Sequence, residues 1–236
     1  MALHKKISRS INLFKMKILV FILTFFTIMT TLVCGQGISP PTLTAGWERI
    51  YIKNTGYFDL PPTMEVQRGK YKEIADENRK IIGFDASQIT AQQKGLNEIS
   101  KIGFEKYARV MVETIFGSVG DFEKSNFNIS IFTPSEISEL DAFQKQNVLQ
   151  NFNGTRIKLI EWFPTKIERI NGMSCIHICY KRQFQNEPIV LVHIYYFQNY
   201  DRMHSLTLSY RISEGEYWKN DFATILKSFR LTNINR

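Results

Sequence analysis

Three residues with metal-binding side chains alternate along one segment of the sequence. Cys175, His177 and Cys179 lie in a stretch that alternates like a β-strand. Thiolates and imidazoles are good zinc ligands, but neighbours on one strand face are about 6.8 Å apart, whereas zinc needs its donors within about 2.3 Å of one point. We therefore expect no metal site here. We interpret the three residues as two buried thiols and a hydrogen-bonded histidine on a sheet face that helices cover. About 13 Å apart, the two cysteines cannot form a disulfide with each other.

Two histidines flank a predicted turn and are the candidates for acid–base chemistry. His193 and His204 lie on either side of the turn that ends at Asp201, so a hairpin could bring all three together. The sequence has no Gly-x-Ser-x-Gly elbow, and no His-Glu-x-x-His motif follows its N-terminal leader. Catalytic triads can be assembled from distant positions, so a hydrolase with a dispersed active site stays an alternative. We predict no catalytic residues and interpret both histidines as surface residues.

Aromatic residues concentrate near the ends of two predicted strands. Trp162 and Phe163 lie in one cluster, and Tyr196 and Tyr200 lie in the other. Aromatic rings give a large contact area at a low entropic cost, so rings that point outward would suit a protein or glycan partner. We take these four residues as a candidate partner surface, with core packing as their alternative role.

The elements that position these residues follow from the periodicity of the C-terminal half. Alternation of apolar and polar residues predicts four strands, at 156–169, 173–183, 189–198 and 205–212, with turn residues between them. Because the connections are short, neighbouring strands should be antiparallel.

Two helices are predicted around these strands. One begins at Pro134, with Thr133 as N-cap and Glu136 at the spacing of a capping box, and it continues to Phe152. The other follows Ser213, which we expect to be its N-cap. Both carry apolar residues at three- and four-residue intervals, so both should pack on the sheet.

The N-terminal half of the domain completes the predicted fold. Strands are predicted at 47–53, 57–60 and 81–92, and residues 97–116 predict a helix that Gly117 ends. Helices gathered against an antiparallel sheet make an α+β layered sandwich. We therefore predict an α+β fold with an antiparallel sheet of about six strands, in one domain over residues 47–236.

The N-terminal segment is predicted to be an export signal. Residues 1–17 hold five Lys or Arg and no acid, and sixteen mostly apolar residues follow at 18–33. As a helix that run would be about 24 Å long, short of the roughly 30 Å hydrocarbon core, so we expect cleavage rather than a permanent span. We assign 1–35 to the signal peptide and 36–46 to a flexible tether. The true start is either Met1 or Met16.

Two kinds of cleavage are compatible with the end of the leader. Val33 and Gly35 are small, which suits a signal peptidase cut after Gly35. Residues 32–35 also resemble a lipobox, in which Cys34 would be the lipidated first residue of a bacterial lipoprotein, although Val33 replaces the usual Gly or Ala. The sequence leaves both open. A lipid anchor or an uncleaved signal is the only membrane attachment expected.

Most of the net positive charge lies in the leader. The chain carries +8, but residues after 35 hold 25 basic and 22 acidic side chains, or +3. A nucleic-acid partner is therefore not expected. The apolar content of 44% and the length fit one globular domain with a real core.

The C-terminal part of the sequence resembles the PsbP-like superfamily. The resemblance rests on Val190–Phe197, His204–Tyr210, Trp218–Phe222 and Ile225–Arg230, and it covers roughly 156–231. It implies an α/β/α sandwich and, as subgroup, the bacterial envelope proteins of the superfamily. Members mostly bind proteins or assist assemblies, and the matching residues are packing residues that imply no catalytic motif.

These observations predict an exported, envelope-associated binding or accessory protein, periplasmic or on the outer envelope. We expect it to use no cofactor, to bind another protein or an envelope component, and not to be an enzyme. An exported hydrolase with a dispersed active site and a structural component of a surface assembly are the alternatives.

Overall fold

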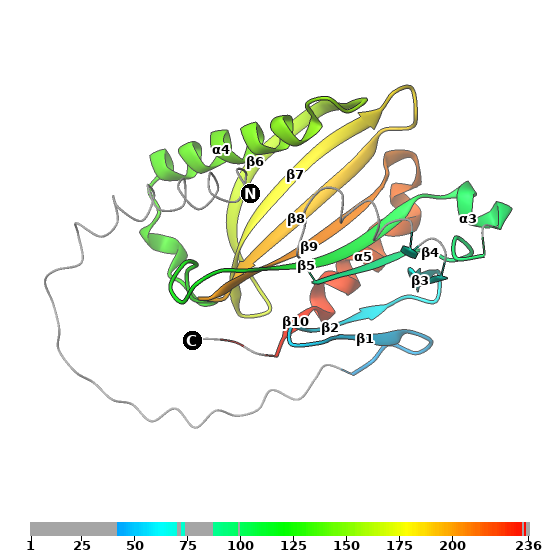
Figure 1. The fold of residues 1–236 in the computed structure, drawn as a ribbon, viewed down its shortest axis with the longest axis horizontal. Helices are drawn as coiled ribbons and strands as arrows, with labels where there is room; N and C mark the ends of the chain where they lie inside the picture. The colour runs from blue at the N-terminus through cyan, green and yellow to red at the C-terminus, as the bar shows by residue number, and fades with distance from the viewer. Residues whose placement is uncertain (1–41, 70–71, 74–86, 99, 233, 235–236) are drawn as a thin grey trace, which may run out of the picture. The chain divides into compact units, whose positions relative to one another are not determined.

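Antiparallel strand pairing organises the fold. The computed structural model describes residues 42–69, 72–73, 87–98, 100–232 and 234. Seven strands form a large antiparallel sheet in the order β3-β4-β5-β9-β8-β7-β6, and three form a small antiparallel sheet in the order β1-β2-β10 (Figure 1). The large sheet contains β3 (Met64–Val66), β4 (Ser87–Gln93), β5 (Ala108–Phe116), β6 (Ile157–Ile170), β7 (Met173–Phe184), β8 (Val190–Gln198) and β9 (Arg202–Arg211). The small sheet contains β1 (Glu48–Ile52), β2 (Gly56–Leu60) and β10 (Arg230–Leu231).

The predicted α+β class and antiparallel sheet are confirmed, with seven strands in the large sheet instead of about six. The four C-terminal strands are found as β6 to β9, and the first two N-terminal strands as β1 and β2. The strand expected at 81–92 is found as β4 from Ser87 onward, and its earlier part lies outside the described residues.

The predicted leader, including Cys34, lies outside the described residues, as does most of the predicted tether. Residues 42–46 at the end of that tether are exposed and belong to no helix or strand. None of the helices in the described part of the chain has the length and the apolar character that crossing a bilayer requires.

The helix predicted over 97–116 is wrong. The structure has a short helix α3 (Lys101–Glu105) followed by strand β5, in which alternate side chains are buried. Val110 and Val112 are fully buried on one face of the sheet, because β5 pairs with β4 on one side and β9 on the other. Their β-branched side chains favour a strand, and pairing along both edges overrides the weaker helical periodicity.

The capped helix predicted from Pro134 is confirmed. Helix α4 (Pro134–Phe152) begins with the expected capping box, in which the Glu136 amide donates to Thr133 Oγ1 at 3.3 Å and the Thr133 amide donates to Glu136 Oε2 at 2.8 Å. Its Val148 packs with Ile178 and Tyr180 of β7 in a small core. We call this side of the large sheet the α4 face.

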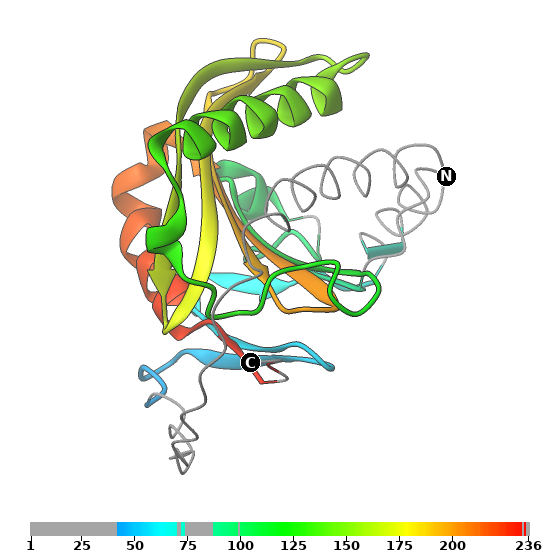
Figure 2. The ribbon, with the colours of Figure 1, turned by 90° about the vertical axis from the view of Figure 1, so that its left-hand side faces the viewer.

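The last helix, α5 (Gly215–Ser228), packs on the opposite side, the α5 face (Figures 1 and 2). It follows a 3-10 turn at Ile212–Glu214, so Ser213 lies in that turn instead of capping the helix. Trp218, Phe222 and Ile225 share the main core with both sheets. The buried members of that core also include Ile50, Ile52, Phe58, Leu60, Val110, Val112, Cys175, Tyr195, Phe197, Leu206, Leu208 and Phe229.

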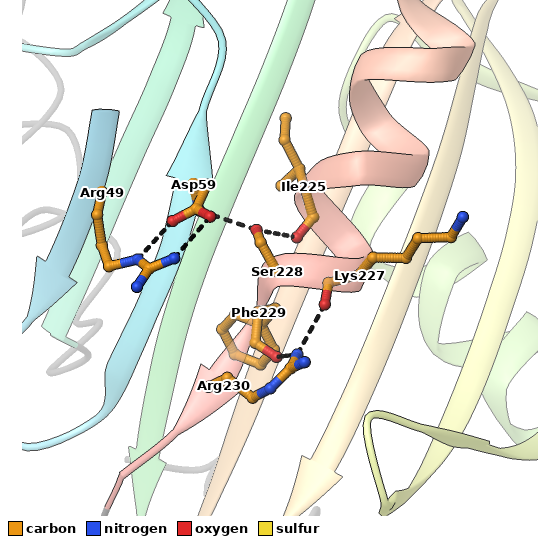
Figure 3. A network of polar contacts seen from close by, with 7 residues as sticks. All are labelled: Arg49, Asp59, Ile225, Lys227, Ser228, Phe229 and Arg230. Atoms are coloured by element: carbon orange, nitrogen blue, oxygen red, sulfur yellow. Dashed lines mark hydrogen bonds and ion pairs between the residues drawn. The ribbon is translucent and has the colours of Figure 1, made fainter. Parts of the chain in front are cut away.

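A buried polar network joins the small sheet to the end of α5 (Figure 3). The Arg49 guanidinium donates to both Asp59 oxygens, at 2.7 and 2.9 Å. The Asp59 amide donates to Ser228 Oγ at 2.8 Å, and that hydroxyl donates to the Ile225 carbonyl at 2.8 Å. Since Asp59 is only 4% exposed, its charge depends on Arg49 for compensation.

Replacing Asp59 by Ala should therefore destabilise the protein strongly. The change breaks the largely buried ion pair between Asp59 and Arg49, and breaking such a pair typically costs about 3–5 kcal/mol. Urea unfolding of Asp59→Ala measures the loss. The exposed pair of Lys219 and Glu216 provides the control, because Lys219→Ala should change stability by less than about 0.5 kcal/mol. Equal effects of the two substitutions would contradict this role of the network.

Candidate functional site

Two histidines meet on the α5 face, but they are not the pair expected from the sequence. His193 lies opposite Cys179 and diagonal to His177, and the His177 Nε2 and His193 Nδ1 atoms are 3.0 Å apart. His204 lies at the other end of the β8–β9 hairpin, opposite Phe197. The predicted meeting of His193 and His204 is therefore wrong, because the hairpin register separates them by several residue pairs.

An acid orients the first histidine. Glu168 Oε1 lies 2.8 Å from His177 Nδ1, and a carboxylate can only accept a hydrogen bond. A neutral His177 therefore carries its proton on Nδ1 and accepts at Nε2 from the Nδ1–H of His193. This leaves the His193 Nε2 lone pair without a hydrogen-bond partner among the described residues. We call Glu168, His177 and His193 the histidine chain.

Stacking and burial set the chemistry of the histidine chain. The Tyr195 ring stacks on His177 with ring centroids 4.3 Å apart, which holds the imidazole in place. Burial lowers the pKa of His177 to about 4, and Lys166 acts in the same direction. Burial also lowers the pKa of His193 to about 4, with His177 and Lys166 contributing. Both rings are thus neutral at pH 7.

The two cysteines beside the histidine chain are protonated thiols. Burial raises the pKa of Cys175 to about 12 and that of Cys179 to about 11, so neither is a thiolate at pH 7. Cys175 is buried and His177 is hydrogen-bonded, as predicted, whereas Cys179 is only half-buried. No group of three or more His, Cys, Asp or Glu side chains in the described residues is placed to hold a metal ion.

The interpretation of His204 as a surface residue is wrong. His204 is 1% exposed, and it lies 2.9 Å from Thr114 Oγ1 through Nδ1 and 3.5 Å from Asn199 Nδ2 through Nε2. Burial lowers its pKa to about 4. Asp201 pairs with Arg202 at 2.7 Å, and its charge partly opposes this lowering of the His204 pKa. Alternation along β9 turns His204 towards the core.

The four aromatic residues chosen from the sequence lie in three places. Trp162 and Tyr196 pack against the small core on the α4 face, where Trp162 Nε1 donates to Asp141 Oδ1 at 2.8 Å. Phe163 lies on the α5 face, because it pairs with Cys179, and Lys181 Nζ is 5.5 Å from its ring centroid. Tyr200 lies in the β8–β9 turn and is 36% exposed. They do not form one surface.

Tyr200 instead belongs to an exposed apolar group that the sequence did not indicate. Phe116 at the end of β5 is 56% exposed, and Val119 in the loop after it is 73% exposed. We call Phe116, Val119 and Tyr200 the tip. Phe116 and Val119 were missed because the predicted helix over 97–116 placed Phe116 at its end and Gly117 as its stop.

Backbone hydrogen bonds hold the two loops of the tip together. The amides of Gly120 and Phe122 both donate to the Tyr200 carbonyl at 3.1 Å, and the Gly117 amide donates to the Asp201 carbonyl at 2.8 Å. The Tyr200 amide returns a bond of 2.9 Å to the Glu123 carbonyl. Tyr200 itself has a φ of 66°, a conformation that this close loop pairing maintains.

Comparison with known proteins gives likenesses at the level of the fold. No protein-family model matches the sequence, and neither does any curated protein. Solved structures that are similar include the cyanobacterial PsbP of Synechocystis sp. PCC 6803, at 14% identity and a TM-score of 0.44, covering 85% of this chain and 99% of that one. A protein of unknown function from Pseudomonas aeruginosa is similar at 9% identity and a TM-score of 0.40, covering 79% of this chain and 98% of that one.

A third similar structure comes from Bacteroides thetaiotaomicron VPI-5482, at 5% identity and a TM-score of 0.39, covering 75% of this chain and 45% of that one. The bacterial envelope subgroup stays a prediction. TM-scores below 0.5 support no inference about function.

The neutral histidines should make the protein less stable at acidic pH. An unfolded histidine has a pKa near 6.5, so between pH 6.5 and pH 4 the unfolded state binds more protons than the folded state. Stability is complete above pH 6.5 and is lost as the pH falls through this window. At pH 5 the loss should be on the order of 1–2 kcal/mol for each histidine.

His193→Phe isolates one contribution. The wild type loses unfolding free energy between pH 7.5 and pH 5. In this variant that loss should be smaller by about 1–2 kcal/mol. The ring keeps its stacking but cannot titrate. An NMR titration of the His193 ring protons gives the direct measurement, and a midpoint near 6.5 would contradict the assignment of a neutral, buried imidazole.

Proposed function

We propose that this protein is an exported, envelope-associated accessory protein that binds a partner protein through the tip and does not catalyse a reaction. The leader sequence motivates export, and the tip motivates binding. The observation that carries the proposal is the exposure of Phe116, Val119 and Tyr200 on two loops that are tied to each other.

Single exposed apolar side chains are ordinary on protein surfaces, but adjacent ones favour an interaction site. The tip places three of them on neighbouring segments, and Arg202 lies 5.4 Å from the Phe116 ring centroid. Aromatic and arginine side chains are enriched among residues that dominate binding energies. Because the loops are already ordered by backbone hydrogen bonds, binding would cost little conformational entropy.

The arrangement that comes nearest to a catalytic one is the histidine chain, and it favours the hydrolase alternative. Its acid, its oriented imidazole and the His193 Nε2 lone pair, which has no partner among the described residues, are parts of a general-base site. A nucleophilic hydrolase also needs an activated hydroxyl or thiol. Cys179, opposite His193, has its pKa raised to about 11, so its thiol is not activated. Because the histidine chain lacks an activated nucleophile among the described residues, the binding function is better supported than the hydrolase function.

A photoreactive amino acid at Val119 should crosslink to a partner in intact cells. Adding Phe116→Ser should weaken the partner complex at least about 10-fold, because a buried aromatic anchor typically contributes more than 1 kcal/mol. Tyr200→Asn should act in the same direction, since Asn tolerates the positive φ of this position while removing the ring. Crosslink yields followed over a range of expression levels give the measurement.

Tyr51 provides the matched control for this experiment. It is 71% exposed on β1, so a photoreactive residue there is equally accessible. The proposal predicts that the adduct formed from position 119 is absent from position 51. An adduct that survives both Phe116→Ser and Tyr200→Asn would exclude the tip as the contact. A purified protein that turns over a substrate and loses this activity on His193→Phe would favour the hydrolase instead.

Export and lipidation can be tested separately. Palmitate should label the wild type but not Cys34→Ala if the lipobox is used, and neither protein if a signal peptidase cuts after Gly35. In both cases N-terminal analysis of the native protein should find the leader removed. An intact leader on a protein recovered from the cytoplasm would refute export.

A further inference from the structure

Two arginines on the α4 face lack an acidic partner in the described part of the chain. Arg109 of β5 and Arg182 of β7 both approach Tyr107, which immediately precedes β5. An Arg182 guanidinium nitrogen donates to Tyr107 Oη at 3.3 Å, and the Arg109 guanidinium carbon is 5.8 Å from the Tyr107 ring centroid. All three side chains are half-buried. We call these three residues the arginine corner.

Glu214 is an acid beside the arginine corner, but other groups already engage it. Glu214 accepts from the Tyr107 amide at 2.8 Å and from Trp218 Nε1 at 3.3 Å through one oxygen. Its other oxygen pairs with Arg211 at 3.3 Å. Glu214 is thus committed to a third arginine and to two neutral donors. The guanidinium groups of Arg109 and Arg182 keep two positive charges in partly desolvated positions, which is unfavourable without an anion.

Two orphaned polar atoms lie at the same place in the sheet. Arg109 Nε and Gln92 Oε1 are buried and have no hydrogen-bond partner among the described residues, and these two residues are directly paired between β4 and β5. Gln92 is fully buried. Buried polar atoms are seldom left unpaired, because each costs about 1–3 kcal/mol. Arg109 Nε requires an acceptor and Gln92 Oε1 requires a donor.

We propose that the arginine corner binds a phosphate group. The oxygens of a phosphate are acceptors for the guanidinium groups and for the Tyr107 hydroxyl, whose own hydrogen has no described acceptor. Its two negative charges match the two arginines that have no acidic partner among the described residues, and arginine is suited to phosphate by its planar set of donors. Free phosphate and the phosphate of a lipid headgroup share this chemistry.

The arginine corner and the tip are independent sites. Arg109 is at the start of β5 and Phe116 is at its end, so seven residue steps separate them, about 24 Å along a strand. Loss of phosphate binding would leave the crosslinking from Val119 unchanged, and a failure at the tip would leave phosphate binding unchanged.

Isothermal titration calorimetry with the full-length protein tests phosphate binding. Inorganic phosphate should bind the wild type, and Arg109→Met and Arg182→Met should each weaken binding about 10-fold or more, because a hydrogen bond to a charged group contributes about 1.5–3 kcal/mol. Tyr107→Phe should weaken it less. Arg169→Met is the matched control, since Arg169 is an exposed arginine on β6 of the same sheet and should have no effect.

Vesicles of phosphatidylcholine with and without phosphatidic acid distinguish the two sources of phosphate. Binding that requires phosphatidic acid, is absent with inorganic phosphate and is lost in Arg109→Met supports a headgroup as the ligand. Binding of inorganic phosphate supports a soluble one. Absence of binding in both arms, or binding that Arg109→Met and Arg182→Met leave unchanged, overturns the proposal. In phosphate-free buffer, both variants should unfold at a urea concentration no lower than that of the wild type, because each substitution removes a positive charge that has no anionic partner among the described residues.

Discussion

The width of the large sheet is the constraint on which the rest of the structure depends. Seven strands about 4.8 Å apart make a surface roughly 29 Å across, whereas a helix with its side chains is about 10 Å wide. Helix α5 therefore needs the small sheet beside it to build the main core. On the other face, α4 packs chiefly on the β6 and β7 edge. On each face of the large sheet, the buried apolar core therefore gives way to residues that are only half-buried.

The histidine chain and the arginine corner both lie at these transitions. Fully buried charges would need partners, whereas fully exposed charges would be stabilised by hydration. Within the described part of the chain, the half-buried histidine chain leaves the His193 Nε2 lone pair without a partner, and the half-buried arginine corner has two cations without an acidic partner. The two clusters differ in kind, since burial has removed charge from the histidines but cannot remove it from arginine.

The sequence predicts the parts of this fold whose signals are local. The capping box at Thr133 and the turns between β6 and β9 need only neighbouring residues, and both were found. Strand β5 was missed because Tyr107, Val110 and Thr114 recur at helical intervals of three and four residues, and only the pairing of this segment with β4 and β9 decides for a strand. The same limit applies to the sites. Tyr200 could be selected as an aromatic residue in a turn, but the approach of His177 to His193 depends on a register between strands.

The bond from the Asp59 amide to Ser228 also constrains the order in which the molecule can be completed. It joins residues 169 positions apart, and β10 closes on β2 over a similar separation. Such contacts form late in folding, because the long intervening segment must close first at a cost in chain entropy. The residues of the β1–β2 hairpin are synthesised early, but their core side chains are buried only once α5 packs against them. The small sheet is therefore completed only after the residues of α5 and β10 have been synthesised.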